Sequence, residues 1–157
     1  MDTRTENKTF HYRTRATWRT ARKGALSAPG KPDIVVGSPP EWRGTPEVWA
    51  PEELLVGSVN TCVMLTFLTL AQPRGVTLVG YESDAEGTLE KVGGVYQMTE
   101  ITVRPRVVVA SDAQREPARQ AMEKVEAHCF MSQSVKATVT LIPEFTVAAS
   151  ELRGHNT

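Results

Sequence analysis

Apolar and polar residues alternate with a period of two near the start of the chain, which is the pattern of a β-strand with one buried face. The alternation covers residues 10–19, with aromatic residues on one side of the pattern. A turn that ends at Gly24 follows, and short apolar stretches occupy residues 25–28 and 34–36. This part of the chain therefore predicts a small group of strands joined by turns.

A second alternating pattern occupies the later part of the chain. Residues 76–90 and 95–110 each predict a long strand, and residues 91–94 between them include two consecutive glycines, which suit a tight hairpin turn. Residues 133–142 alternate again and predict a last strand, whereas the tail after Pro143 is weakly patterned. We expect these strands to form a mostly antiparallel sheet.

Residues 51–71, between the two strand regions, predict a helix that is apolar on nearly every side. Pro51 suits the first helical position. Glu52 and Glu53 follow in the first turn, where the helix dipole favours negative charge. Such a helix should be buried on nearly every side. It is long enough to raise the question of a membrane span, but its Ser, Asn and Thr residues favour a core helix.

A second helix is expected after residue 110, with Ser111 or Asp112 as its cap. Apolar residues recur there with the spacing of one helical face. That face consists of Ala118, Ala121, Met122, Val125 and Cys129. The whole order of elements predicts an α+β fold, in which a buried central helix and an amphipathic helix pack on one face of the sheet.

Composition indicates a soluble globular protein with one core. The chain has 157 residues, of which 40% are hydrophobic and 23% charged. Lys+Arg and Asp+Glu are equal at 18 each, so no basic excess points to nucleic acid or to an acidic membrane as a partner. The polar start of the chain lacks the apolar segment of a signal peptide, and we therefore expect a cytoplasmic protein.

The only two cysteines, Cys62 and Cys129, fall one in each predicted helix. In a reducing compartment they are either small inert core residues or a nucleophile and its resolving partner. His128 suggests a Cys–His dyad with Cys129, but adjacent residues of a helix point about 100° apart, which favours a solvated or core-edge histidine. The histidines and cysteines show no recognised metal-ligand spacing.

A family resemblance distinguishes between these two interpretations of the cysteines. The segment Pro51-Glu52-Glu53-Leu54-Leu55, with Cys62 ten positions after Glu52, resembles the central motif of the OsmC/Ohr family of thiol-dependent hydroperoxide reductases.

Two further segments extend the resemblance. Residues 129–134 resemble the family's second-cysteine segment, although Phe130 stands where many members have proline. Residues 18–24 resemble the family's opening turn. We therefore expect a polar tail over residues 1–8, one OsmC-like domain over 9–145 and a second tail over 146–157.

The resemblance implies a reaction and a role for each residue. The Cys62 thiolate would attack the O–O bond of an organic hydroperoxide, and Cys129 would condense with the resulting sulfenic acid to a disulfide. Arg22 matches the family's catalytic arginine, with Arg19 as the second candidate, and Glu52 matches the carboxylate that holds it. An external dithiol of lipoyl type would reduce the disulfide, and no bound cofactor is expected.

The spacing of Glu52 and Cys62 favours a homodimer. Ten residues of α-helix span about 15 Å, so the two side chains cannot meet along one straight helix. If they share an active site, Glu52 must come from a second subunit together with its Arg22. The N-terminus of the helix that holds Cys62 is also too far away to lower the pKa of this thiol. We therefore expect an arginine to lower the pKa of Cys62.

The resemblance, together with the spacing of Glu52 and Cys62, implies a homodimeric peroxidase that reduces organic hydroperoxides in oxidative-stress defence. Apolar residues near Cys62 in the sequence, such as Met64 and Phe67, favour an organic substrate over hydrogen peroxide. The alternative is a non-catalytic protein of the same fold that binds an apolar ligand or senses redox state.

Overall fold

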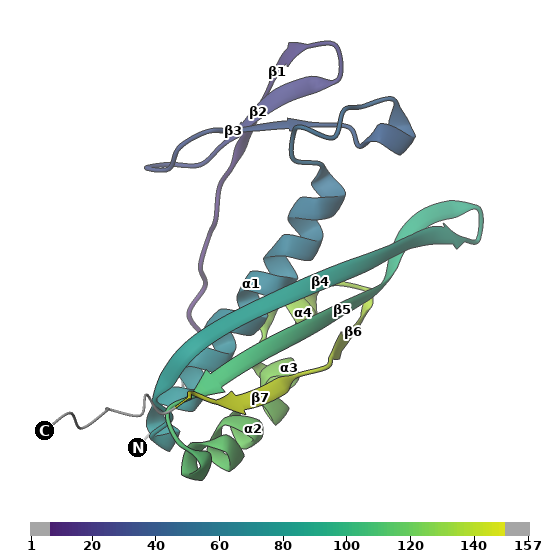
Figure 1. The fold of residues 1–157 in the computed structure, drawn as a ribbon. Coiled ribbons are helices and arrows are strands. Elements are labelled where there is room, and N and C mark those ends of the chain that lie inside the picture. The colour runs from purple at the N-terminus through teal and green to yellow at the C-terminus, as the bar shows by residue number, and fades with distance from the viewer. Residues whose placement is uncertain (1–6, 150–157) are drawn as a thin grey trace, which may run out of the picture. The chain divides into compact units, whose positions relative to one another are not determined.

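The computed structural model describes residues 7–149 of the chain. They belong to two compact units, and the boundary lies between Pro51 and Glu52 (Figure 1).

The N-terminal unit contains a three-stranded antiparallel sheet. Its strands, in the order β1-β2-β3, are β1 (Arg15–Thr20), β2 (Lys23–Ser27) and β3 (Ile34–Gly37), and the short 3-10 helix η1 (Pro40–Trp42) follows.

β1 is shorter than the alternation predicted. Its pairing with β2 starts at Arg15, opposite Ser27 at the end of β2, so the preceding residues have no strand beside them in this unit. The predicted buried face of this strand is also wrong for the single chain, because every residue of β1 is exposed and Trp18 retains 75% of its exposure.

The second unit begins with the long helix α1 (Pro51–Ala71), whose bounds match the sequence prediction. The short 3-10 helix η2 (Gln72–Arg74) follows, and Gly75 then adopts a left-handed conformation with φ +70°. Glycine takes this conformation without strain, which explains why the helical segment stops here.

The predicted hairpin is confirmed. β4 (Leu78–Val92) pairs with β5 (Val95–Val109) in antiparallel register from Leu78 opposite Val109 to Val92 opposite Val95. Gly93 and Gly94 form the turn with φ values of +59° and +85°. Two consecutive residues with positive φ give the turn whose twist matches that of the strands.

The predicted second helix is divided into several short helices. They are η3 (Asp112–Gln114), α2 (Arg115–Glu123), α3 (Val125–His128) and α4 (Phe130–Ser134). The predicted apolar face is nevertheless confirmed, because all five of its residues are buried. The break before α4 lies at Cys129, whose backbone is extended with φ −76° and ψ 112°.

The last part of the sheet differs from the prediction. Residues 130–134 are helical, so the expected strand over 133–142 is reduced to β6 (Thr138–Leu141). The weakly patterned tail contributes β7 (Glu144–Val147). Both strands pair in parallel with the same edge of β5, because the helices carry the chain back before it re-enters the sheet. Pro143, which lacks an N–H, lies between them.

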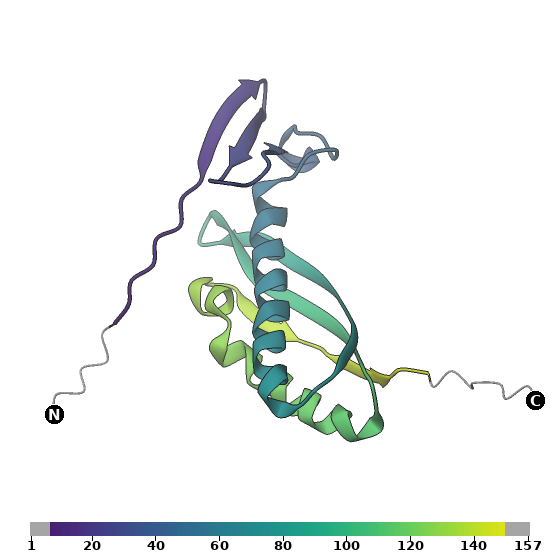
Figure 2. The same cartoon turned by 90° about the vertical axis from the view of Figure 1, so that its left-hand side faces the viewer.

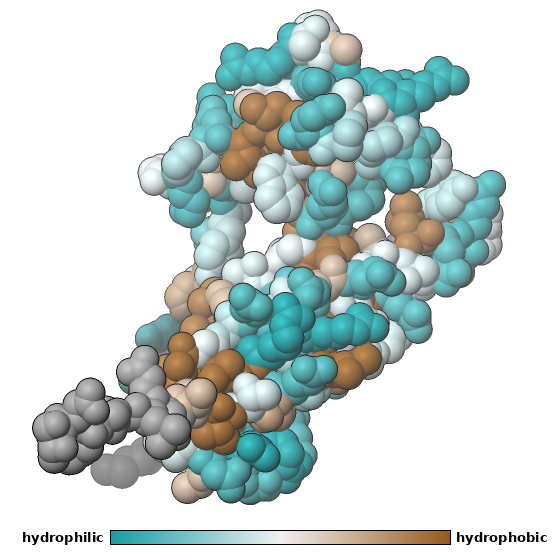
Figure 3. All heavy atoms as spheres, in the orientation of Figure 1, coloured by the Kyte–Doolittle hydropathy of each residue, from teal (hydrophilic) through white to brown (hydrophobic). Residues whose placement is uncertain are grey.

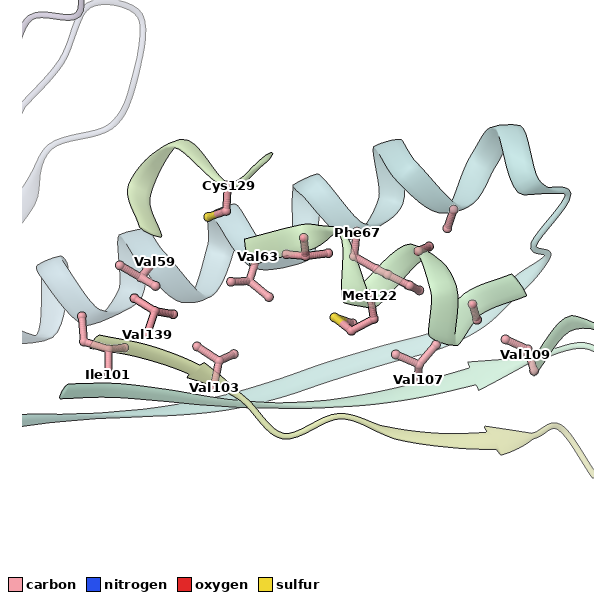
Figure 4. Packing of buried hydrophobic residues seen from close by; sticks show 14 of the residues in the cluster. Val59, Val63, Phe67, Ile101, Val103, Val107, Val109, Met122, Cys129 and Val139 are labelled. Atoms are coloured by element: carbon pink, nitrogen blue, oxygen red, sulfur yellow. The ribbon is translucent and has the colours of Figure 1, made fainter. Parts of the chain in front are cut away.

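The core of this unit lies between the helices and one face of the sheet (Figures 2 and 4). Its largest fully buried side chains include Phe67 from α1, Ile101 and Val103 from β5, and Val125 from α3. Hydrophilic side chains gather over the middle of the opposite sheet face (Figure 3). There Arg106 forms ion pairs with Glu82 and Asp84.

The prediction that α1 is buried on nearly every side is wrong for the single chain. Val59, Val63, Phe67 and Ala71 are buried on the face toward the sheet. Elsewhere on the helix Leu55, Leu65 and Leu68 are 38%, 53% and 37% exposed. Among the described residues, 51–74 form the one helical segment that is long and apolar enough to cross a membrane. A helix that covers an apolar interface meets the same criterion.

Candidate active site

The structure brings the two cysteines together from different elements of the second unit. Cys62 lies in the middle of α1, is partly exposed and packs against the core. Cys129 lies between α3 and α4 and is fully buried. Figure 4 shows Cys129 next to α1, near Val59 and Val63. Both thiols are free, and Cys62 packs against the buried cluster that contains Cys129.

The surroundings of Cys62 favour its thiolate. Burial by itself raises the pKa of Cys62, but hydrogen bonds from the Met131 N–H, the Cys129 thiol, the Thr66 hydroxyl and the Phe130 N–H outweigh it and leave the pKa below its ordinary value. Thr66 Oγ1 lies one helical turn further along α1, 3.9 Å from the Cys62 sulfur. A thiol with a lowered pKa is the form that nucleophilic chemistry requires.

Two of these donors come from the start of α4, a source that the sequence analysis missed. The extended backbone at Cys129 ends α3 and lets α4 begin anew, so the first N–H groups of α4 have no partner within that helix. Phe130 and Met131 direct theirs to Cys62. Within one chain these N–H groups lower the pKa of Cys62 without an arginine, and a contribution from Arg22 or Arg19 stays a prediction.

The pKa of Cys129 is shifted in the opposite direction from that of Cys62. Burial raises the pKa of Cys129, and the neighbouring Cys62 raises it further, whereas the Ser132 hydroxyl and N–H act in the opposite direction without cancelling the rise. Cys129 is therefore the cysteine that keeps its proton. The two cysteines therefore differ in protonation: the surroundings favour a thiolate at Cys62 and a protonated thiol at Cys129.

Glu52 lies on the same helix as Cys62 but in its first turn. Along a straight helix this separates the two residues by about 15 Å, so they do not meet within one chain. The Glu52 Oε2 atom is buried and has no hydrogen-bond partner among the described residues. An unpaired buried carboxylate oxygen is unfavourable, so a single chain leaves Glu52 unsatisfied.

Arg22 and Arg19 lie in the N-terminal unit. Arg19 belongs to β1, whereas Arg22 lies in the turn between β1 and β2. Within this unit Arg22 lines a cavity of about 220 Å³ together with the cationic residues Lys23 and Arg43. No ion pair of Arg22 or Arg43 occurs in the described part of the chain, so neither charge is neutralised there.

His128 does not form a dyad with Cys129. Its ring is exposed, and its Nδ1 atom hydrogen-bonds to the carbonyl oxygen of Lys124 at 2.8 Å. This agrees with the solvated histidine expected from the sequence. Over residues 7–149 no group of three or more His, Cys, Asp or Glu side chains is arranged to hold a metal ion.

Comparisons with known proteins confirm the resemblance and the α+β fold. The uncharacterized protein YmaD of Bacillus subtilis is 27% identical over 142 residues, which cover 87% of this chain and 94% of YmaD. An OsmC-like protein of unknown function from Vibrio cholerae has a TM-score of 0.77 at 22% identity and covers 87% of this chain and 99% of its own.

An organic hydroperoxide resistance protein of Elizabethkingia anophelis has a TM-score of 0.71 at 14% identity, covering 90% of this chain and 99% of its own. These likenesses establish the fold. The family profile described as OsmC-like protein matches residues 44–144, more than half of the sequence, and the chain therefore belongs to the OsmC-like protein family.

Proposed function

We propose that this protein is a thiol peroxidase that reduces organic hydroperoxides in oxidative-stress defence in the cytoplasm. The observation that carries the proposal is the packing of the partly exposed Cys62 against the cluster that contains the buried Cys129, and the lowered pKa of Cys62 and the raised pKa of Cys129 support it. Inert core cysteines need no such arrangement. Several structural relatives are organic hydroperoxide resistance proteins, which agrees with this substrate class.

The reaction begins with attack of the Cys62 thiolate on the terminal oxygen of the hydroperoxide, the one that carries the hydrogen. An S–O bond forms, the O–O bond breaks, and the alkoxide leaves and takes up a proton to become an alcohol. Cys62 is oxidised to a sulfenic acid. Cys129 then attacks this sulfur, an S–S bond forms and the hydroxyl group leaves as water. An external dithiol, which we propose to be of lipoyl type, exchanges with the disulfide and restores both thiols.

The exposed side of α1 supports a homodimer. Leu55, Leu65 and Leu68 leave apolar surface uncovered along a helix that carries the reactive thiol. A second copy of the chain offers a matching apolar surface, and obligate dimers bury such surface in their interfaces. The dimer also lets Glu52 and Arg22 of one subunit complete the site around Cys62 of the other.

The proposal is tested by peroxide consumption with cumene hydroperoxide and a dihydrolipoyl reductant. The wild-type protein should turn over repeatedly, Cys62→Ser should be inactive, and Cys129→Ser should stall after about one turnover with Cys62 driven to sulfinic acid. Equal activity of wild type and Cys62→Ser would refute the proposal. An inactive wild-type protein whose Cys62 pKa is at or above about 8.5 would instead favour a binding protein or redox sensor.

Mixed dimers test the shared site. A Cys62→Ser chain and a chain with both Glu52→Ala and Arg22→Ala should each be inactive alone. In a mixed dimer, however, the second chain supplies an intact Cys62 and the first supplies intact Glu52 and Arg22. One complete site results, so activity should return to about half of the wild-type value per dimer. No return of activity in a verified mixed dimer would contradict a shared site.

A further inference from the structure

Ser132 has a buried hydroxyl group that the proposed reaction leaves without a role. It is the third residue of α4, and Cys129 is the cap that precedes this helix. The Ser132 Oγ atom is shielded from solvent and has no hydrogen-bond partner among residues 7–149. An unsatisfied buried hydroxyl is unfavourable and calls for an explanation.

Ser132 lies one helical turn from Cys129, which caps α4. A cap residue and the third residue of a helix face each other across the first turn, as the pair in a capping box does. The other serine of α4 differs, because the Ser134 hydroxyl donates to the Phe130 carbonyl oxygen at 2.6 Å and is satisfied. Ser132 is thus the serine of α4 whose hydroxyl remains available to the buried sulfur.

Oxidation of Cys62 changes what surrounds Cys129. In the reduced protein, the neighbouring Cys62 thiolate favours the protonated form of Cys129 and so helps burial to keep the pKa of Cys129 high. Once Cys62 is a neutral sulfenic acid, that effect ends. Burial still opposes the Cys129 thiolate, and the groups that favour it are the hydroxyl and the N–H of Ser132. Cys129 is fully buried, so water cannot reach its sulfur to donate a hydrogen bond in place of the Ser132 hydroxyl.

We propose that Ser132 is a positioning residue for the resolving step, in which its hydroxyl donates a hydrogen bond to the Cys129 sulfur as this sulfur loses its proton and attacks Cys62. The Cys129 proton passes to the departing hydroxyl group of the sulfenic acid, which leaves as water. Ser132 keeps its own proton throughout. The inference rests on the proposed function, because it concerns a sulfenic acid at Cys62.

The charged groups next to Cys129 do not stabilise its thiolate in place of Ser132. His128 precedes it in the chain, but its ring is exposed and bonds to the Lys124 carbonyl. From α1 the group that faces Cys129 is Cys62 itself. Among the described residues no cationic side chain contributes to the pKa of Cys129.

The test compares Ser132→Ala with Ser134→Ala, a matched control on the same helix. Single-turnover oxidation with cumene hydroperoxide separates formation of the sulfenic acid, trapped by dimedone, from formation of the disulfide. Ser132→Ala should form the sulfenic acid at the wild-type rate but close the disulfide roughly tenfold more slowly, the factor expected for a lost hydrogen bond to a charged group. The pH at which disulfide closure reaches its plateau should rise.

Ser132→Thr keeps the hydroxyl and should restore most of the resolving rate. A second measurement does not depend on peroxidase activity. In a Cys62→Ser background, thiolate absorbance at 240 nm against pH should show a higher Cys129 pKa for Ser132→Ala than for Ser134→Ala.

Disulfide closure at the wild-type rate in Ser132→Ala, or equal slowing in Ser134→Ala, would overturn the inference. Failure of the wild-type protein to form any sulfenic acid would instead refute the proposed function. In that case an unchanged Cys129 pKa in Ser132→Ala would show separately that the hydroxyl does not serve Cys129.

Discussion

Cys62 of α1 packs against the same hydrophobic cluster that contains Cys129, which lies between α3 and α4, although the two residues lie far apart in the sequence. Cys129 is fully buried, whereas Cys62 is partly exposed. Burial raises the pKa of Cys129, whereas hydrogen bonds outweigh burial at Cys62 and lower its pKa, so the proton belongs on the inner sulfur and the negative charge on the outer one. This order is what a peroxidase needs, because the sulfur that meets the substrate must be the thiolate.

The first prediction concerns the order of ionisation. Hydrogen bonding lowers the pKa of Cys62, so its alkylation by iodoacetamide should rise with pH through a midpoint below that of a free cysteine. Alkylation of Cys129 should require a higher pH. Peptide mapping of protein alkylated over a pH series measures both midpoints. A Cys62 midpoint at or above that of free cysteine would contradict the assignment.

The second prediction uses Phe130, which stands where many family members have proline. Phe130→Pro removes one N–H donor to Cys62 and should raise its pKa. The fold should tolerate the change, because proline suits the first position of a helix and the extended backbone of Cys129 suits the residue before a proline. Phe130→Ala keeps the N–H and is the control. Equal Cys62 midpoints in the two variants would exclude this donor.

The third prediction concerns the hydrogen bonds that hold α1 against the sheet. The Ser83 hydroxyl donates to Asn60 Oδ1 at 2.6 Å, and Asn60 Nδ2 donates to the Ser83 carbonyl oxygen at 3.2 Å. Asn60→Ala loses both bonds and should reduce the free energy of unfolding by about 1–3 kcal/mol in urea titrations. Thr61→Ala, at an exposed neighbour, should change it by less than about 0.5 kcal/mol. Similar losses in both variants would argue against this pair.

The fourth prediction concerns the exposed apolar side of α1. Leu65→Asp places a charge where the proposed dimer buries a leucine, and it should shift the protein toward monomer in sedimentation velocity experiments. Gln120→Asp, at an exposed position of α2, should leave the dimer intact. A wild-type protein that is monomeric, or that sediments with liposomes in a flotation assay, would show that something other than a second copy covers this helix.

The elements predicted most accurately are those with strong local signals. Pro51 and the uncharged run that follows the two glutamates defined α1. Alternation and the glycine pair at 93–94 defined the hairpin of β4 and β5. Each signal lies within the element itself, so no distant contact was needed to interpret it.

The elements that the sequence did not predict depend on distant partners. α4 is five residues long and begins after a cysteine, which is not a preferred cap, so nothing local marked its start. β6 and β7 are short and exist because the edge of β5 is available to them. The two cysteines could be singled out from the sequence, but the N–H donors from Phe130 and Met131 could not, since they depend on the backbone of Cys129.

The central claim is that Cys62 and Cys129 form one redox pair, and a mass map of the oxidised protein tests it most directly. After treatment with one equivalent of cumene hydroperoxide, a non-reduced digest should contain a peptide pair joined by a Cys62–Cys129 disulfide within one chain. Dithiol treatment should remove it, and the Cys129→Ser variant should instead show sulfenic or sulfinic acid at Cys62. Oxidation that leaves both thiols free, or that yields only disulfides between chains, would contradict the account.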